Sequence, residues 1–430
     1  MIHRFIGSET QAREAAATLA ELDRALSSEQ FLEAILEGLP ASVIEGVRRA
    51  LNTERRELSE LLEAYNQAKG GKYDLIWRKA AGDPGAILIA ARICRNLSQK
   101  ELARKLGLRE QAIQRYEAER YRSISLANFL KFASVLGVEW QITLSPPFKS
   151  GSALSKELSP NDARKLLKHA RAHGWFASEI SSDEDGISQL KRYVADHVAK
   201  YGTPSLLRTG LNVVDHTDDW SLLCWKAQVT RRAEKILEQE AVAPYHPLDV
   251  SWLLQLVRLS AKEDGPKRAA DMLREHGIVL IAEPHIQGMK VDGAAFLVGD
   301  VPVVGLTLLR DTVDNFWFTL LHETAHVILH YRTGLATGFF DDIQAEAVDE
   351  MEAEANAFAA DLPIPSEVWR RSPARIAKTA APVEALARNL GIHPAIIFGR
   401  IRKERGDWSI YANKIGQGTI RRQFFGDTAR

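Results

Sequence analysis

Residues 314–330 read DNFWFTLLHETAHVILH, and this stretch decides how the C-terminal part of the chain is built. Its apolar residues recur at helical spacing, which predicts a buried α-helix. His322 and His326 are four residues apart, just over one turn, so they project from one face and can hold one Zn²⁺ ion. Glu323 lies about 100° round the helix, near the metal but outside its ligands, where it can take a proton from water.

A third ligand is expected from the acidic stretch 349–365, DEMEAEANAFAADLPIP. On a helix, Glu352 shares its face with Asn356 and with small alanines that let this helix approach the first one. Glu354 instead shares its face with Phe358. A Glu four residues before an Asn, downstream of His-Glu-x-x-His, is the gluzincin pattern. Glu352 is therefore the predicted third ligand, beside a predicted general base on the first helix.

Two apolar segments upstream predict a small sheet. Residues 277–283, GIVLIAE, have the composition of a strand, and residues 293–308 consist of two apolar runs joined by Gly299-Asp300. A two-residue connection with Gly first is typical of a β-hairpin. The last domain, expected at 244–430, is therefore α+β. Outside the motif, Arg400 and Arg402 are expected on a solvated helix face, and His330 and Tyr331 are interpreted as a continuation of the helix more than as catalytic groups.

This C-terminal domain resembles the ImmA/IrrE family of metallopeptidases over residues 246 to about 405. The resemblance rests on DNFWFTLLHETAHVILH, on EAEANAFAADLPIP and on GIHPAIIFGRI. Asp361 and Ile364 depart from the family's LLMP ending, which bears on packing or substrate access more than on ligation. The family implies a zincin-like fold and Zn²⁺-dependent cleavage of a protein, often a partner repressor, in response to stress or foreign DNA.

Residues 86–138 contain four short helical patterns of the helix-turn-helix type. Ser98 and Glu101 form a capping box at the start of the second pattern, and Gly107 permits the tight turn before the third. The predicted small core comprises Leu102, Ala103, Leu106, Ile113, Tyr116, Leu126, Leu130 and Leu136.

The third pattern leaves polar side chains exposed, namely Arg109, Glu110, Gln111, Gln114 and Arg115. Between residues 92 and 122 there are nine Lys and Arg against four Asp and Glu, a local charge of +5 in a chain whose net charge is zero. A basic surface suits a polyanion. Gln and Arg also read adenine and guanine edges with two hydrogen bonds each, so this surface predicts binding to double-stranded DNA.

Residues 86–140 resemble the XRE family of helix-turn-helix domains. The resemblance implies that Gln99 contacts phosphate, that Glu110, Gln111 and Arg115 read bases with Arg109 nearby, and that Arg92 and Glu117 form a buried ion pair. Such domains usually bind palindromic operators as dimers, so a homodimer is implied. Residues 9–140, including LLEAYNQAK at 61–69, also resemble the HigA-like antitoxins more loosely.

Length and composition predict a mainly α-helical chain of several domains. The 430 residues exceed what one core usually supports, and an apolar content of 45% with 26% charged residues is ordinary for a globular protein. We expect an N-terminal helical region at 1–70, the helix-turn-helix domain at 71–147, a helical connector at 148–243 and the metallopeptidase domain at 244–430. Two cysteines, no signal-peptide pattern and no spanning segment favour a cytoplasmic location without a membrane partner.

Three functions remain open on this reading. The first is a transcriptional regulator whose peptidase domain cleaves itself or a partner, such as a toxin or repressor, and so changes promoter occupancy. The second is an antitoxin-like repressor whose zinc domain is a sensor or partner-binding platform with little turnover. The third is a peptidase that uses DNA only for placement. Glu323 favours the first over the second, because a purely structural zinc site needs no general base.

Overall fold

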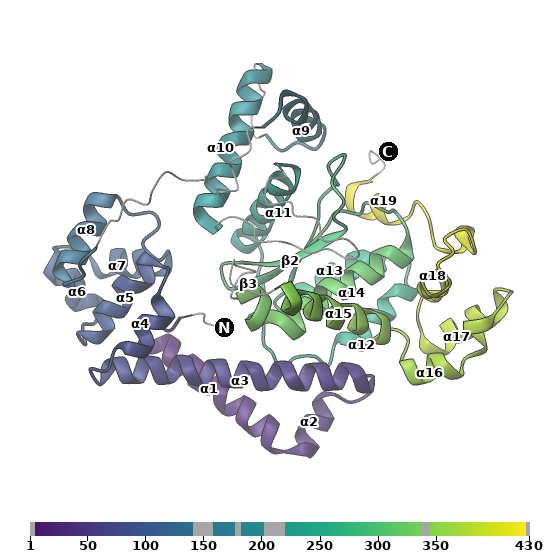
Figure 1. Ribbon diagram of the computed structural model, residues 1–430, viewed down its shortest axis with the longest axis horizontal. Helices are drawn as coiled ribbons and strands as arrows, with labels where there is room; N and C mark the ends of the chain where they lie inside the picture. The colour runs from purple at the N-terminus through teal and green to yellow at the C-terminus, as the bar shows by residue number, and fades with distance from the viewer. Residues whose placement is uncertain (1–4, 141–157, 177–181, 202–219, 337–344, 427–430) are drawn as a thin grey trace. The chain divides into compact units, whose positions relative to one another are not determined.

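The computed structural model describes residues 5–140, 158–176, 182–201, 220–336 and 345–426 (Figure 1). The chain forms two compact units, one from Met1–Glu29 and Asn52–Ser150, the other from Gln30–Leu51 and Gly151–Arg430. Helix α3 (Ala41–Lys69) belongs to the second unit up to Leu51 and to the first unit beyond it. The described residues are mainly helical with one small sheet, which confirms the predicted fold class.

The first unit is helical throughout its described residues. Besides the later part of α3 it contains α1 (Glu9–Ser27), α4 (Asp74–Ala80), α5 (Pro84–Cys94), α6 (Gln99–Leu106), α7 (Glu110–Ala118) and α8 (Leu126–Val135). The capping box at Ser98 and Glu101 is present at the start of α6, and Gly107 ends α6 in the left-handed conformation with φ 69°. Both local predictions for the helix-turn-helix are thus confirmed.

The core of the first unit differs from the prediction on α8. Leu102, Ala103, Leu106, Ile113 and Leu136 are buried as expected. Leu126 and Leu130 are instead 74% and 51% exposed, so their assignment to the core was wrong. The face of α8 that packs inward runs through Phe132 and Ala133, and Leu126 and Leu130 lie to one side of it.

The second unit holds the sheet and the remaining helices. Its helices are the main part of α2 (Glu29–Ile35), the first part of α3, α9 (Pro160–Ala172), α10 (Asp183–Tyr201), α11 (Trp220–Gln239), α12 (Leu253–Arg258), α13 (Gly265–Glu275), α14 (Val313–His330), α15 (Ala345–Asp361), α16 (Ser366–Arg371), α17 (Ala381–Leu390), α18 (Pro394–Arg405) and α19 (Ile420–Phe425). Three short 3₁₀ segments occur at Leu259–Ala261, Pro373–Ile376 and Ala412–Lys414, and a π-helical segment at Tyr331–Ala336.

The sheet has three strands in the order β1, β3, β2. Strand β1 (Val279–Ala282) runs parallel to β3 (Val301–Leu306), and β2 (Gly293–Val298) runs antiparallel to β3. Val298 pairs with Val301, so Gly299 and Asp300 form a two-residue turn in which Gly299 has φ 63°. The predicted strand and the predicted hairpin are both confirmed.

The sheet is packed between two helices. Gly293 of β2 lies against Thr319 and Glu323 of α14, whereas Gly305 of β3 lies against Trp225 of α11. Gly293 pairs with Leu306, the neighbour of Gly305, so the two glycines face opposite sides of the sheet. The unit therefore has three layers, α11, the sheet and α14, and the metal-binding motif lies on the α14 side.

Connector helices α9, α10 and α11 share one apolar core with the sheet. Their buried side chains, such as Leu166, Val194 and Trp225, pack with Val279 and Phe296 of the strands. The buried Glu283 carboxylate, just after β1, accepts a hydrogen bond from Trp175 Nε1 at 2.9 Å. The connector is thus built into the second unit.

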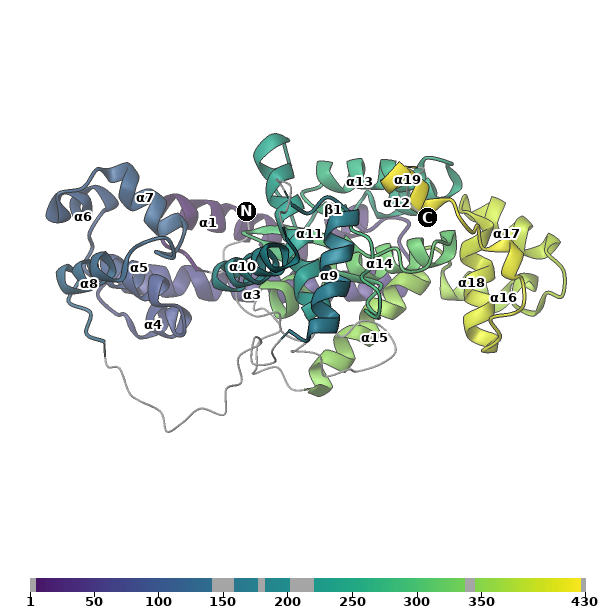
Figure 2. The same cartoon turned by 90° about the horizontal axis from the view of Figure 1, so that it is seen from above.

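Helices α16, α17 and α18 lie together at one end of the second unit (Figure 2). Arg400 of α18 donates to the carbonyl oxygens of Ala360 and Ile364 at 3.1 and 2.9 Å. Arg402 is buried and lies 3.6 Å from the Asp314 carboxylate of α14. The expectation that these arginines form a solvated face was therefore wrong, because both arginines tie α18 to the α14–α15 region.

Among the described helices, none combines the length and the apolar character that a membrane-spanning segment requires.

Candidate metal centre and nucleic-acid interface

Helix α14 carries the motif and is buried over most of its surface. Phe316, Trp317, Leu320 and Leu321 fill the core around it. Such burial explains why most of the helix outside the motif residues is apolar. His326 follows His322 by four residues, so both rings lie on the same side of the helix, in an edge-to-face arrangement with centroids 4.8 Å apart.

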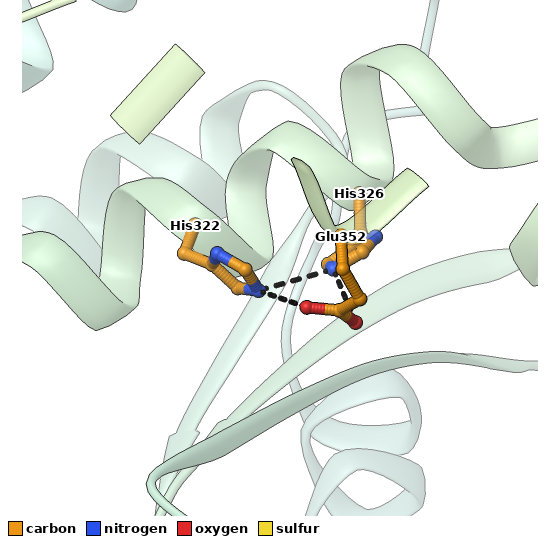
Figure 3. A group of neighbouring side chains, drawn as sticks. All are labelled: His322, His326 and Glu352. Atoms are coloured by element: carbon orange, nitrogen blue, oxygen red, sulfur yellow. Dashed lines mark hydrogen bonds and ion pairs between the residues drawn. The ribbon is translucent and has the colours of Figure 1, made fainter. Parts of the chain in front are cut away.

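Glu352 of α15 meets these two rings (Figure 3). The Nε2 atoms of His322 and His326 lie 3.2 Å apart. The Glu352 carboxylate oxygens lie 3.2 Å from His322 Nε2 and 3.4 Å from His326 Nε2. In the part of the chain that the structure describes, this is the one group of three or more His, Cys, Asp or Glu side chains close enough to share a metal ion.

The spacing and protonation of these donors fit a tetrahedral metal. Ligand atoms about 2.1 Å from zinc stand about 3.4 Å from one another in a tetrahedron. The Oε2 atom of Glu352 is buried and makes no hydrogen bond of good geometry within the described residues, so it has a free lone pair. Two imidazoles and one carboxylate are a common ligand set for zinc that keeps a fourth position open.

Electrostatics in the group keep His326 neutral and Glu352 ionised. Burial lowers the pKa of His326 to about 4, which keeps that ring neutral. Burial opposes the charged form of Glu352, but the two adjacent histidines outweigh it and lower its pKa to about 2. Burial likewise opposes protonated His322, yet the Glu352 and Glu323 carboxylates raise its pKa. A neutral His326 and an ionised Glu352 are in the states that a metal ion needs.

Glu323 lies beside the group and is 4% exposed. Its carboxylate accepts a hydrogen bond from the backbone amide of Ala295 in β2. Burial raises its pKa to about 7, while the neighbouring His322 opposes the rise. A carboxylate with a pKa near neutrality can both accept and release a proton at physiological pH. The sequence carried no sign of the Ala295 contact, because it depends on how β2 packs against α14.

His330 and Tyr331 lie outside the group of three donors, although His330 contacts one of them, His326. His330 Nδ1 lies 3.1 Å from His326 Nδ1, and His330 Nε2 lies 2.9 Å from Glu354 Oε2. The Tyr331 hydroxyl donates to the Asp300 carbonyl at 3.1 Å. The structure thus brings His322, His326 and Glu352 together and places Glu354 one step further out.

On the first unit, all five side chains predicted for the DNA-binding surface around the third helical pattern are exposed. Arg109 precedes α7 as its N-cap residue, and Glu110, Gln111, Gln114 and Arg115 follow within α7. The buried residues Ile113 and Glu117 face the opposite way. The Arg115 guanidinium lies over the Tyr116 ring, 5.3 Å from its centroid, which limits the directions it can take. This arrangement is what a helix needs to enter a groove of DNA.

Gln99 is held differently from these five. It starts α6, is half-buried, and donates from Nε2 to Glu117 Oε2 at 2.7 Å. Glu117 in turn pairs with Arg92, whose Nη2 lies 2.8 Å from the same oxygen. The buried ion pair implied by the XRE resemblance is therefore present, and the Gln99 side-chain amide is joined to it.

Comparison with known families agrees with this geometry. Residues 88–142 match the helix-turn-helix family, and residues 273–398 match the family described as an IrrE N-terminal-like domain. No curated protein and no solved structure matches the chain. The looser HigA-like resemblance stays a prediction. Two segments of the chain are thus similar to known families, one to helix-turn-helix domains of the XRE type and the other to the IrrE N-terminal-like domain.

Proposed function

We propose that the protein is a DNA-binding transcriptional regulator whose second unit is a zinc-dependent peptidase, and that cleavage of a protein changes promoter occupancy. The observation that carries this proposal is the position of Glu323. It is buried next to His322, and its pKa is about 7. A site that only stored a structural metal would not need a proton acceptor there.

We infer that His322, His326 and Glu352 hold the metal, because their donor atoms have the spacing and the free lone pairs that zinc requires. Zinc, when bound, polarises a carbonyl group and lowers the pKa of water to about 7. The three side chains would hold the metal on the α14 side of the sheet, and the packing of α14 against the sheet fixes the helix that carries two of them.

In this proposal Glu323 is the general base. It accepts a proton as the water oxygen forms a bond to the peptide carbonyl carbon. It then returns that proton to the departing amine nitrogen as the carbon–nitrogen bond breaks, so that the carboxylate is regenerated. The backbone amide of Ala295 stabilises the ionised form of this carboxylate.

The first unit would place the protein at its operator. Glu110, Gln111 and Arg115 are the proposed base-reading side chains, with Arg109 and Gln114 around them, and Gln99 is the proposed phosphate contact. Because one α7 covers a half-site, we propose that two copies bind a palindromic operator as a homodimer. The protein that is cleaved is either this chain or a partner such as a repressor or toxin.

One observation favours an alternative without turnover. The side chains of His322, His326 and Glu352 are only 7%, 6% and 16% exposed, so a peptide must reach the metal past a largely closed surface. A zinc domain of this kind can serve as a sensor or as a platform for a partner. Glu323→Gln separates the two functions, since Gln preserves size and hydrogen bonding but does not act as a base.

The test uses the full chain with the protein encoded beside it. Wild type and Glu323→Gln are purified, checked for equal zinc content and equal operator affinity, and incubated with that protein, and the products are identified by mass spectrometry. We expect cleavage by wild type and a loss of about 100-fold or more in the variant. Normal promoter regulation by Glu323→Gln under inducing conditions would assign the zinc domain to sensing.

A further inference from the structure

His330 lies directly behind a proposed metal ligand. It is 3% exposed, and its Nδ1 atom lies 3.1 Å from Nδ1 of His326. The other nitrogen of His326, Nε2, faces His322 and Glu352. A histidine that gives its Nε2 lone pair to a metal carries its proton on Nδ1, so His326 must donate that proton to His330.

The direction of the next contact follows from the first. Because His330 accepts at Nδ1, its own proton is on Nε2, and it donates to Glu354 Oε2 at 2.9 Å. The second oxygen of Glu354, Oε1, accepts from Arg49 Nη2 at 2.8 Å. His326, His330, Glu354 and Arg49 thus form one continuous chain of hydrogen bonds, with an ion pair at its outer end.

Arg49 comes from a distant part of the sequence and is held by its helix. Ser42, seven residues before it on α3, donates to Asp361 at 2.7 Å, and Asp361 lies seven residues after Glu354 on α15. The two contacts show that α3 and α15 run in opposite directions where they meet. Gly46, which lies between Ser42 and Arg49 on α3, packs against Leu329 of α14. A Cβ at Gly46 would be 3.2 Å from Leu329 Cδ2.

We propose that Arg49, Glu354 and His330 are positioning residues that fix the tautomer and orientation of His326 and thereby raise the affinity of the metal centre. This inference rests on the proposed zinc function of the second unit. It extends that function by making the segment Gln30–Leu51 part of the metal centre, although the segment lies outside residues 273–398 that match the metallopeptidase family.

The exposure of Arg49 and Glu354 decides whether their effect should be measured on folding stability or on zinc affinity. The Arg49 and Glu354 side chains are 58% and 39% exposed, so their ion pair adds little to folding stability. Partners that orient a metal-bound histidine nevertheless change metal affinity by about 10- to 100-fold. We call His330, Glu354 and Arg49 the relay. Removing the Arg49–Glu354 ion pair at its outer end should therefore lower zinc affinity, while the free energy of unfolding stays nearly unchanged.

The experiment measures zinc affinity of the full chain by competition with a chelator, and the visible absorption spectrum after loading with Co²⁺. The variants are His330→Ala, Glu354→Gln, Arg49→Ala and Arg49→Lys. We expect affinity to fall about 10- to 100-fold in the first two and about 10-fold or somewhat less in Arg49→Ala. Arg49→Lys should restore most of the affinity, and the Co²⁺ bands should shift in the variants that lose it.

Two matched controls on the same helix isolate the relay. Glu45→Ala removes the other partner of Arg49, and Ser42→Ala removes a contact that docks α3 without touching the relay. Both should leave zinc affinity and the Co²⁺ spectrum unchanged. An equal loss in Ser42→Ala, or wild-type values in Arg49→Ala, would overturn the relay while leaving the metal centre intact. A wild-type chain that binds no zinc would reject the proposed metal centre and the relay together.

Discussion

Glu323 of α14 packs directly against Gly293, the first residue of β2: a Cβ at Gly293 would stand 3.1 Å from Glu323 Cγ and 2.9 Å from Thr319 Cγ2. The space beside the strand is therefore occupied by the carboxylate side chain. Two residues further along β2, the amide of Ala295 donates to the same carboxylate. One strand thus sets both the room and the orientation of the proposed base.

Gly293→Ala should consequently disturb the proposed general base, Glu323, more than it disturbs zinc binding. The added methyl group overpacks the strand–helix contact, which typically costs about 1 to 3 kcal/mol. We expect a lower midpoint of urea unfolding and a loss of proteolysis, with zinc content per chain near that of wild type. Gly70→Ala is the control for the loss of a glycine, because Gly70 is outside the left-handed region and the nearest atom to a Cβ there, Gln67 O, lies 3.4 Å away. Full proteolysis in Gly293→Ala would contradict the assignment of Glu323.

The raised pKa of Glu323 predicts how stability of the zinc-free protein depends on pH. Its value of about 7 in the folded chain exceeds its ordinary 4.5, so folding favours the protonated acid. Stability from this group is fully present below pH 4.5 and is lost as pH rises through 7, a change of about 3 kcal/mol. Glu323→Gln removes the loss, so with chelator present it should be more stable than wild type at pH 8.

Urea unfolding at pH 8 and pH 5 measures this difference. The advantage of Glu323→Gln should shrink to a small part of its pH 8 value at pH 5, because pH 5 is only slightly above the ordinary pKa of 4.5 and the folded wild-type chain still keeps its proton. The same advantage at both pH values would mean that packing rather than ionisation separates the two proteins.

The proposed metal ligands predict that replacing Glu352 causes a greater loss of zinc than replacing Glu354. Glu352 contacts the Nε2 atoms of His322 and His326, whereas Glu354 contacts His330 and Arg49. Glu352→Ala should therefore abolish zinc retention after dialysis. Glu354→Ala should retain zinc at saturating concentration and lose it only as the free metal falls, because it removes an outer partner. Metal analysis of dialysed protein tests the order, and the reverse result would move the ligand role to Glu354.

On the DNA side, base-reading and phosphate contacts predict different losses. Arg115→Ala or Gln111→Ala should cost about 1 to 3 kcal/mol on the operator and relax preference at one position. Gln99→Ala should weaken all sequences alike. Lys131→Ala on α8 is an exposed basic control. Binding titrations at fixed salt against operator and scrambled duplexes make the comparison, and an unchanged operator affinity in Arg115→Ala would refute the recognition surface.

The buried pair of the first unit predicts a large loss of stability. Glu117→Ala leaves the Arg92 guanidinium buried without its carboxylate and removes the partner of Gln99. Breaking a buried pair on one side costs about 3 to 5 kcal/mol. Glu119→Ala, two residues away and exposed, should change stability by about 0.5 kcal/mol or less. Chemical unfolding of the two variants compares them, and similar midpoints would show that the pair contributes little.

Local patterns predicted the parts of this protein that depend on neighbouring residues. The capping box at Ser98, the hairpin at Gly299 and the helical spacing of His322 and His326 are all set within a few residues of sequence. Glu352 could be named because helix periodicity sorts the acidic residues of α15 onto different faces. Features that depend only on residues close together in the sequence can be predicted from the sequence alone.

Contacts between distant segments could not be predicted in this way. Leu126 and Leu130 have helical spacing, but no rule within α8 says which of its apolar sides is covered. Arg402 looks like a surface residue until α18 packs on α14 and meets Asp314. Arg49 and Glu354 lie 305 residues apart, so nothing near either residue in the sequence indicates the other.

The segments of the two units alternate along the chain, and this alternation limits how recombination could exchange one unit for another. Residues 1–29 and 52–150 form the first unit, whereas residues 30–51 and 151–430 form the second. Each unit is therefore built from two separate segments of the chain. A recombination event that carried away residues 151–430 alone would take His330 and Glu354 but leave Arg49 behind, and would uncover Leu329. The two units are interleaved, so neither can be exchanged as one contiguous cassette.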